Sequence, residues 1–232
     1  MYHKTALTAA VMAVLVSTPI SAQGFVGAEL GIDVFAFSDD TNLGYTTYSG
    51  SLEYGITRNF DVAIDLSRYG LNSLDENVNN ATLHAVYHPS NTMSVGAFFG
   101  RDYFNRGSID SLGIEGGAEV FGGDLEGFLG RIDDGTDTGT IYGISGAYPL
   151  GGNFAATGEV KAADIGGNTL TRAALGAQYG FDRGPNLYGQ IGTIDVGATN
   201  ETFFSLGATV ALGSQRGTTF GSRSLLDIVP GY

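Results

Sequence analysis

The sequence predicts an all-β protein: a closed, transmembrane, antiparallel up-and-down β-barrel of twelve strands. The main observation is a repeated alternation of apolar with small or polar residues, separated by short turns rich in Gly, Asn, Asp and Pro. In segment 60–67, Val62 and Ile64 share one face, whereas Asp61 and Asp65 share the other. A period of two residues indicates a β-strand with unlike faces. Repeated strands of this kind are typical of a barrel wall that faces lipid on one side.

Twelve alternating segments account for most of the chain. Each covers roughly the 9–11 residues that a tilted strand needs to cross a bilayer, and boundary errors leave a range of about 10 to 14 strands. The segments are 25–37, 45–56, 60–69, 81–88, 93–102, 109–121, 125–132, 140–148, 154–162, 170–181, 187–194 and 202–212.

Charged residues are sorted onto one register of these segments. The other register carries Leu, Ile, Val, Phe and Tyr, as in Leu30, Ile32 and Val34. A charge facing lipid near the midplane costs roughly 2–4 kcal/mol, so the charged register must face the lumen. The candidate pore-lining residues are Glu53, Asp61, Asp65, His84, His88, Glu115, Glu119, Glu126, Glu159, Lys161 and Arg172.

The connections predict how the barrel sits in the membrane. Those after even-numbered segments are tight, such as 57–59 and 122–124, whereas those after odd-numbered segments are longer, such as 38–44, 72–80 and 133–138. Outer-membrane barrels have short periplasmic turns and longer outside loops. The acidic loops are therefore expected outside the cell.

Aromatic residues near segment ends predict girdles at the two membrane interfaces, where amphipathic rings are favoured. The candidates are Phe25, Phe35, Phe37, Tyr45, Tyr54, Phe60, Tyr69, Tyr87, Phe121, Tyr148, Phe154, Phe181 and Tyr188.

The N-terminal residues 1–22 have the layout of a secretory signal peptide: a positive start, a short apolar run and small residues before the expected cleavage site after Ala22. Removing this segment removes Lys4, one of only 11 Lys and Arg residues, while all 24 Asp and Glu residues stay. That acidic balance argues against nucleic-acid binding. The chain has no cysteine, which excludes disulfides and a lipid anchor at the cleavage site.

With these features, segment 23–213 resembles Gram-negative outer-membrane β-barrels of the small porin-like kind. The C-terminal residues 217–232 are similar to tails of alphaproteobacterial outer-membrane proteins. The resemblance implies the cell outer membrane, its lipid and the barrel-assembly machinery as partners. Porin-like final strands usually end in an aromatic residue, whereas this one ends in Leu212.

The tail, 214–232, has two arginines and one aspartate, opposite in sign to the rest of the chain. We expect it to be a periplasmic extension, because chain termini fray by default. The alternative is that it folds into the acidic lumen and narrows it.

The resulting functional prediction is a porin-like channel for passive diffusion of small hydrophilic solutes or ions, with a preference for cations because rings of Asp and Glu favour them. A non-transporting structural or adhesive barrel and a secreted soluble β-protein are alternatives. A barrel hydrolase that uses His84 or His88 with Asp61, Asp65 or Ser67 is a third alternative, but no known serine or histidine motif accompanies them. The protein is thus predicted not to be an enzyme, and no metal or cofactor is predicted.

Overall fold

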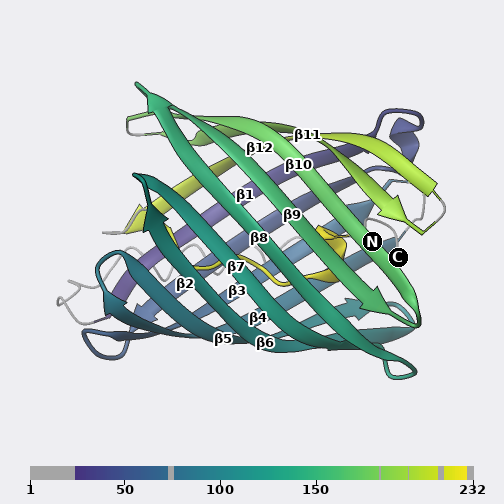
Figure 1. The fold of residues 1–232 in the computed structure, drawn as a ribbon, viewed down its shortest axis with the longest axis horizontal. Coiled ribbons are helices and arrows are strands. Elements are labelled where there is room, and N and C mark those ends of the chain that lie inside the picture. The colour runs from purple at the N-terminus through teal and green to yellow at the C-terminus, as the bar shows by residue number, and fades with distance from the viewer. Residues whose placement is uncertain (1–23, 73–75, 183, 198, 214–216, 229–232) are drawn as a thin grey trace, which may run out of the picture.

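The computed structural model describes residues 24–72, 76–182, 184–197, 199–213 and 217–228. The predicted signal peptide, residues 1–22, lies outside this part of the chain. Twelve antiparallel strands form a single closed barrel, in which each strand pairs with its neighbours in sequence and β1 pairs with β12 (Figure 1). The predicted fold class and strand number are therefore confirmed.

The strands are 11 to 15 residues long, and two short 3₁₀ helices, η1 (Thr41–Leu43) and η2 (Leu225–Asp227), accompany them. No helix in the described ranges is long and apolar enough to span a bilayer. The strand bounds are β1 (Phe25–Phe37), β2 (Tyr45–Gly55), β3 (Phe60–Leu71), β4 (Glu76–Ser90), β5 (Met93–Phe104), β6 (Gly107–Val120), β7 (Gly123–Asp133), β8 (Thr138–Gly151), β9 (Phe154–Ile165), β10 (Asn168–Gly180), β11 (Asn186–Val196) and β12 (Thr199–Gly213).

The two ends of the barrel differ less than the sequence predicts. Connections 56–59 and 91–92 lie at one end, here called the turn end, and connections 38–44 and 134–137 lie at the other, the loop end (Figure 1, left and right). The predicted loop 72–80 is wrong, because β4 already begins at Glu76. Asn77, Asn79 and their neighbours pair with β3 although they are polar, since sheet pairing satisfies their backbone groups. Which end faces outward therefore stays a prediction.

The outer face of the wall is apolar along its length. Leu175 is 73% exposed, Leu206 65%, Ile114 64% and Ile191 63%, and all belong to the register predicted to face lipid. Exposure of this many large apolar side chains would be unfavourable in water. The band therefore fits a bilayer as the solvent of this face.

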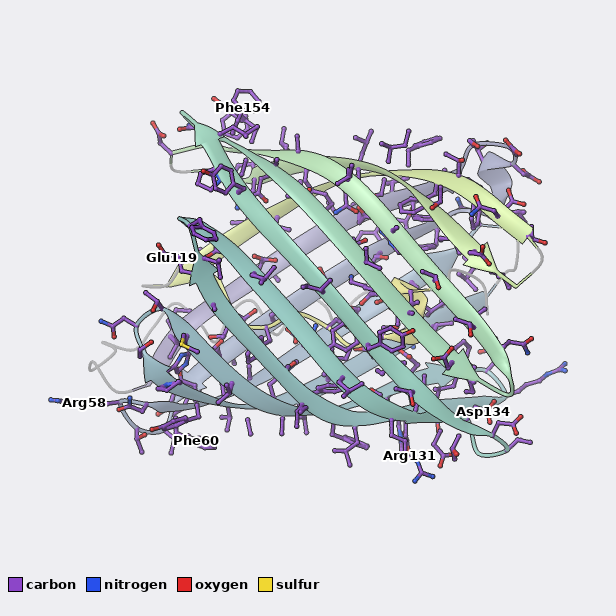
Figure 2. The ribbon with its side chains drawn as sticks, in the orientation of Figure 1. Arg58, Phe60, Glu119, Arg131, Asp134 and Phe154 are labelled. Atoms are coloured by element: carbon purple, nitrogen blue, oxygen red, sulfur yellow. The ribbon has the colours of Figure 1, made fainter. Side chains whose placement is uncertain are left out.

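The aromatic girdle is found at the turn end. Tyr54, Tyr87, Tyr148 and Phe154 are each at least half exposed on the outer face, and Figure 2 shows Phe60 and Phe154 on the outside of that end. The same prediction is wrong for Phe35, Tyr45 and Tyr69 near the loop end, which are buried. Their positions share parity with Asp33, Thr47 and Asp65, so the alternation of the strand turns them into the lumen.

A charge on the outer face is expected to destabilise the barrel in lipid. Ile114→Arg places a guanidinium on the apolar band of β6 and should cost about 2–4 kcal/mol of unfolding free energy in a bilayer. Equilibrium unfolding from lipid vesicles measures this cost, and Thr136→Arg, in the connection 134–137, is the control. Equal stabilities of the two variants would contradict a lipid-facing β6.

Candidate functional site: the barrel interior and its C-terminal plug

The predicted pore-lining residues all lie on the inner register of the wall, but they fall into three groups. Asp61, His88, Glu119, Glu126 and Glu159 line a cavity of about 760 Å³ at the turn end. Glu53, Asp65, His84 and Glu115 are buried, and Lys161 and Arg172 both pair with Glu159. Their access to solvent therefore depends on what occupies the lumen.

The described part of the C-terminal tail occupies the lumen (Figure 1, yellow). We call residues 217–228 the plug. It starts at the turn end, where Gly217 passes so close to β1 that a Cβ on Gly27 would lie 1.8 Å from the Gly217 carbonyl oxygen. Only glycine at position 27 leaves room for the plug backbone. This placement differs from the periplasmic extension that the sequence favoured for the tail.

The first plug contact is with Glu53 on β2. The Thr219 backbone N–H donates to Glu53 Oε2 at 2.5 Å, and its hydroxyl donates to Oε1 at 2.8 Å. The side chain of Glu53 is fully buried under this contact. A carboxylate that accepts two such bonds offsets part of the cost of its burial.

Arg223 holds the middle of the plug. Its Nε and Nη2 donate to Glu115 Oε2 at 3.0 and 2.8 Å, and Nη2 also pairs with Glu126 Oε1. The guanidinium stacks over the Phe128 ring, 4.6 Å from its centroid. Because Arg223 is only 6% exposed, these partners replace the water that a free guanidinium would bind.

Glu115 connects Arg223 to a buried histidine. His84 Nδ1 lies 2.7 Å from Glu115 Oε1, and His84 Nε2 lies 2.7 Å from Asp65 Oδ2. Phe220 of the plug lies beside the imidazole, with ring centroids 6.4 Å apart. Both ring nitrogens of His84 are therefore used by carboxylates, and neither is directed at a serine.

Asp102 caps the short helix η2 at the far end of the plug. Its Oδ1 accepts from Ser224 Oγ at 2.7 Å, and its Oδ2 accepts from the Leu225 N–H at 2.9 Å. Asn80 donates to the same Oδ1 at 2.8 Å. At the last residue of η2, the Tyr69 hydroxyl donates to Asp227 Oδ1 at 2.7 Å, and burial raises the pKa of the Asp227 carboxyl.

The loop-end half of the lumen is apolar. Leu225, Leu226 and Ile228 are at most 2% exposed and pack into two clusters of inward-facing wall residues. These clusters contain Phe98, Ile109, Ile132, Ile141, Ala163, Ile165 and Leu170, and Phe35, Tyr45, Tyr69, Val78, Ala174, Ile194 and Phe203. The lumen is therefore acidic at the turn end and filled by an apolar core at the loop end.

His88 lies at the turn end, within a second set of polar contacts. Its Nε2 lies 3.0 Å from Asp61 Oδ2 and its Nδ1 lies 2.9 Å from Ser94 Oγ. In a Ser–His–Asp triad Nε2 faces the serine and Nδ1 faces the carboxylate, whereas here Nε2 faces Asp61 and Nδ1 faces Ser94. With its two ring nitrogens used in this reversed order, His88 does not favour acyl transfer by the triad mechanism.

Comparisons with known proteins identify the fold. No family model matches the chain, and no curated protein is similar to it in sequence. Among solved structures, the chain is similar to the NanC porin (TM-score 0.61, 9% identity, 77% of this chain and 98% of that one) and the KdgM porin (0.59, 10%, 78% and 97%). It is also similar to the COG4313 outer-membrane channel from Pseudomonas putida F1 (0.54, 12%, 83% and 97%). The chain has the fold of these outer-membrane barrels.

Proposed function

We propose that this protein is an outer-membrane channel for small hydrophilic solutes that prefers cations and is held closed by its own C-terminal plug. The observation that carries the proposal is the acidic cavity of about 760 Å³ at the turn end, which ends at the plug. Asp61, Glu119, Asp124 and Glu126 line it, and so does Glu159, which pairs with both Lys161 and Arg172. Rings of acidic side chains favour cations in such pores.

The fold similarity supports the class of function. The similar proteins are named as porins or as a channel, and one KdgM structure is described as a complex with oligogalacturonate. An acidic lumen favours a different solute from that polyanion, because like charges repel at short range. We further infer a place in an alphaproteobacterial outer membrane, with periplasmic turns and assembly by the barrel-assembly machinery.

Ion selectivity tests the proposal. The refolded protein without residues 214–232 is recorded in a planar bilayer under a salt gradient. Its reversal potential should have the sign that indicates a current carried mainly by cations. Replacing Glu119 and Asp124 with lysine should move this potential toward anion selectivity, since both residues line the cavity. Asp134→Lys, outside the lumen in the connection 134–137, is the control and should leave it unchanged. An anion preference of the starting protein would contradict the proposal.

A closed structural barrel is the second candidate function. The specific observation that favours it is the apolar core in the loop-end half, where Phe35, Phe98 and Phe203 of the wall are buried together with plug residues. This candidate expects no conductance whether or not the plug is present.

A further inference from the structure

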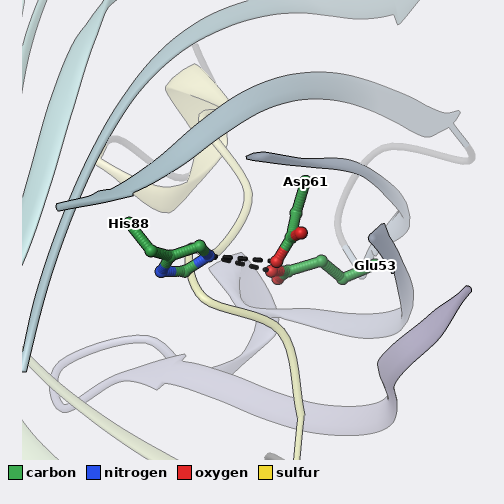
Figure 3. Close-up of side chains that lie close together, drawn as sticks. All are labelled: Glu53, Asp61 and His88. Carbon is green, nitrogen blue, oxygen red and sulfur yellow. Dashed lines mark hydrogen bonds and ion pairs between the residues drawn. The ribbon is translucent and has the colours of Figure 1, made fainter. Parts of the chain in front are cut away.

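We propose that Glu53, Asp61 and His88 form a binding site for a divalent transition-metal ion of the Zn²⁺ type at the turn end of the lumen (Figure 3). The sequence gives no metal-ligand spacing for these residues, because they come from three strands, β2, β3 and β4. The barrel pairing brings the strands side by side, with Gly55 opposite Asp61 and Asp61 opposite Val86.

The distances between the donor atoms suit one ion. One donor atom from each residue lies within 4.8 Å of the other two. His88 Nε2 is 3.0 Å from Asp61 Oδ2 and 3.9 Å from Glu53 Oε1. Ligands about 2.0–2.1 Å from a tetrahedral Zn²⁺ stand roughly 3.3 Å apart, so small side-chain movements would complete the geometry.

The charge of the cluster suits a cation. Two carboxylates face each other while the side chains of Glu53 and Asp61 are 0% and 7% exposed. Within the described residues, no ion pair joins either of them to Lys or Arg. Burial of neighbouring negative charges without compensation is unfavourable, and a divalent ion with a neutral imidazole would balance both.

Neighbouring groups orient the His88 ring in the way that a metal-binding histidine is usually oriented. Ser94 Oγ, 2.9 Å from Nδ1, can accept a hydrogen bond from Nδ1–H, which leaves the lone pair of Nε2 free for a metal. The His88 backbone is fixed to the β2–β3 turn, because its N–H donates to the Asn59 carbonyl at 2.8 Å and Asn59 Nδ2 donates to the His88 carbonyl at 2.7 Å. The ligand is thus positioned before an ion binds.

The site is accessible and leaves a coordination position open. Asp61 and His88 line the acidic cavity, so an ion can arrive through water, and a water molecule can be its fourth ligand. Imidazole nitrogen among the donors favours Zn²⁺, Cu²⁺ or Ni²⁺ over Mg²⁺ and Ca²⁺, which prefer all-oxygen sites. Through Glu53, the ion would also lie beside Thr219 of the plug.

Calorimetric titration of the tag-free, refolded protein with ZnCl₂ tests the site. We expect one Zn²⁺ per chain, with an affinity that falls by about tenfold or more in His88→Gln and in Asp61→Asn. Asp124→Asn, which removes an acidic group from the same cavity but outside the cluster, should bind as the unchanged protein does. Equal losses in all three variants would overturn the proposal, since they would indicate nonspecific attraction to the acidic cavity.

A spectroscopic measurement on the unchanged protein covers the case in which a variant does not fold. Zinc X-ray absorption should show one imidazole nitrogen and oxygen ligands at about 2.0–2.1 Å. Only-oxygen coordination, or failure of the unchanged protein to bind Zn²⁺, would also overturn the proposal.

Discussion

Arg223→Ala is expected to release the plug from the lumen. The change removes the cation that pairs with the buried Glu115 and the part-exposed Glu126, and it removes the stacking on Phe128. Breaking a buried ion pair from one side typically costs about 3–5 kcal/mol. The cost falls on the docked state alone, because undocking lets water reach both carboxylates. The docked-to-undocked ratio should therefore fall by about two to four orders of magnitude.

Limited proteolysis of the refolded protein measures this release. Proteinase K should cut the Arg223→Ala chain within 217–228 much faster than the unchanged chain, where Leu225 and Leu226 are fully buried. Arg131→Ala is the matched control, because the Arg131 side chain is 68% exposed and its pair with Asp133 spans 3.8 Å. Such a surface pair contributes only about 0–1 kcal/mol. Equal cleavage of Arg223→Ala and Arg131→Ala would contradict a plug fixed by Arg223.

Two further variants separate the effect of the Arg223 charge from that of its planar shape. Arg223→Lys keeps the charge but cannot contact Glu115 and Glu126 with one planar group, so partial release is expected. Combining Arg223→Met with Glu115→Gln and Glu126→Gln removes the unpaired charges, and protection should recover in part.

The wall of the barrel could be predicted from the sequence because its period is simple. Alternation assigns Asp61, Asp65 and His84 to one face and Val62 and Ile64 to the other, and the strands in the structure keep this parity. Parity is local information, so it needs no knowledge of which strands pair.

The contents of the lumen could not be predicted in the same way. Phe35 and Phe203 have inward parity, but near strand ends apolar residues occur on both registers, so they do not differ locally from residues of the aromatic girdle. Their burial depends on side chains from other strands and from the plug. The same holds for the contact of Asp102 with Leu225 and for that of Arg223 with Glu126, which join residues 123 and 97 positions apart in sequence. The one available signal was the basic charge of the tail against an acidic wall.

Removal of the plug is the second change with a large expected effect. Deletion of residues 214–232 takes Phe220, Arg223, Leu225, Leu226 and Ile228 out of the lumen, all of them at most 6% exposed. The contacts of Thr219, Arg223 and Leu225 with Glu53, Glu115 and Asp102 are lost, and water can solvate these carboxylates. A twelve-stranded wall is wider than the eight-stranded barrels that side chains alone can fill. The deletion should therefore join the turn-end cavity to the loop end through water.

Single-channel recording of the full-length and truncated proteins in the same bilayer is the most direct test of a lumen closed by its own C-terminus. The full-length protein should stay closed or conduct weakly, and the chain that ends at Gly213 should conduct at least severalfold more. Deletion of residues 229–232 alone keeps 217–228 and should behave as the full-length protein does. Equal conductance of the full-length protein and the chain that ends at Gly213 would contradict the plug.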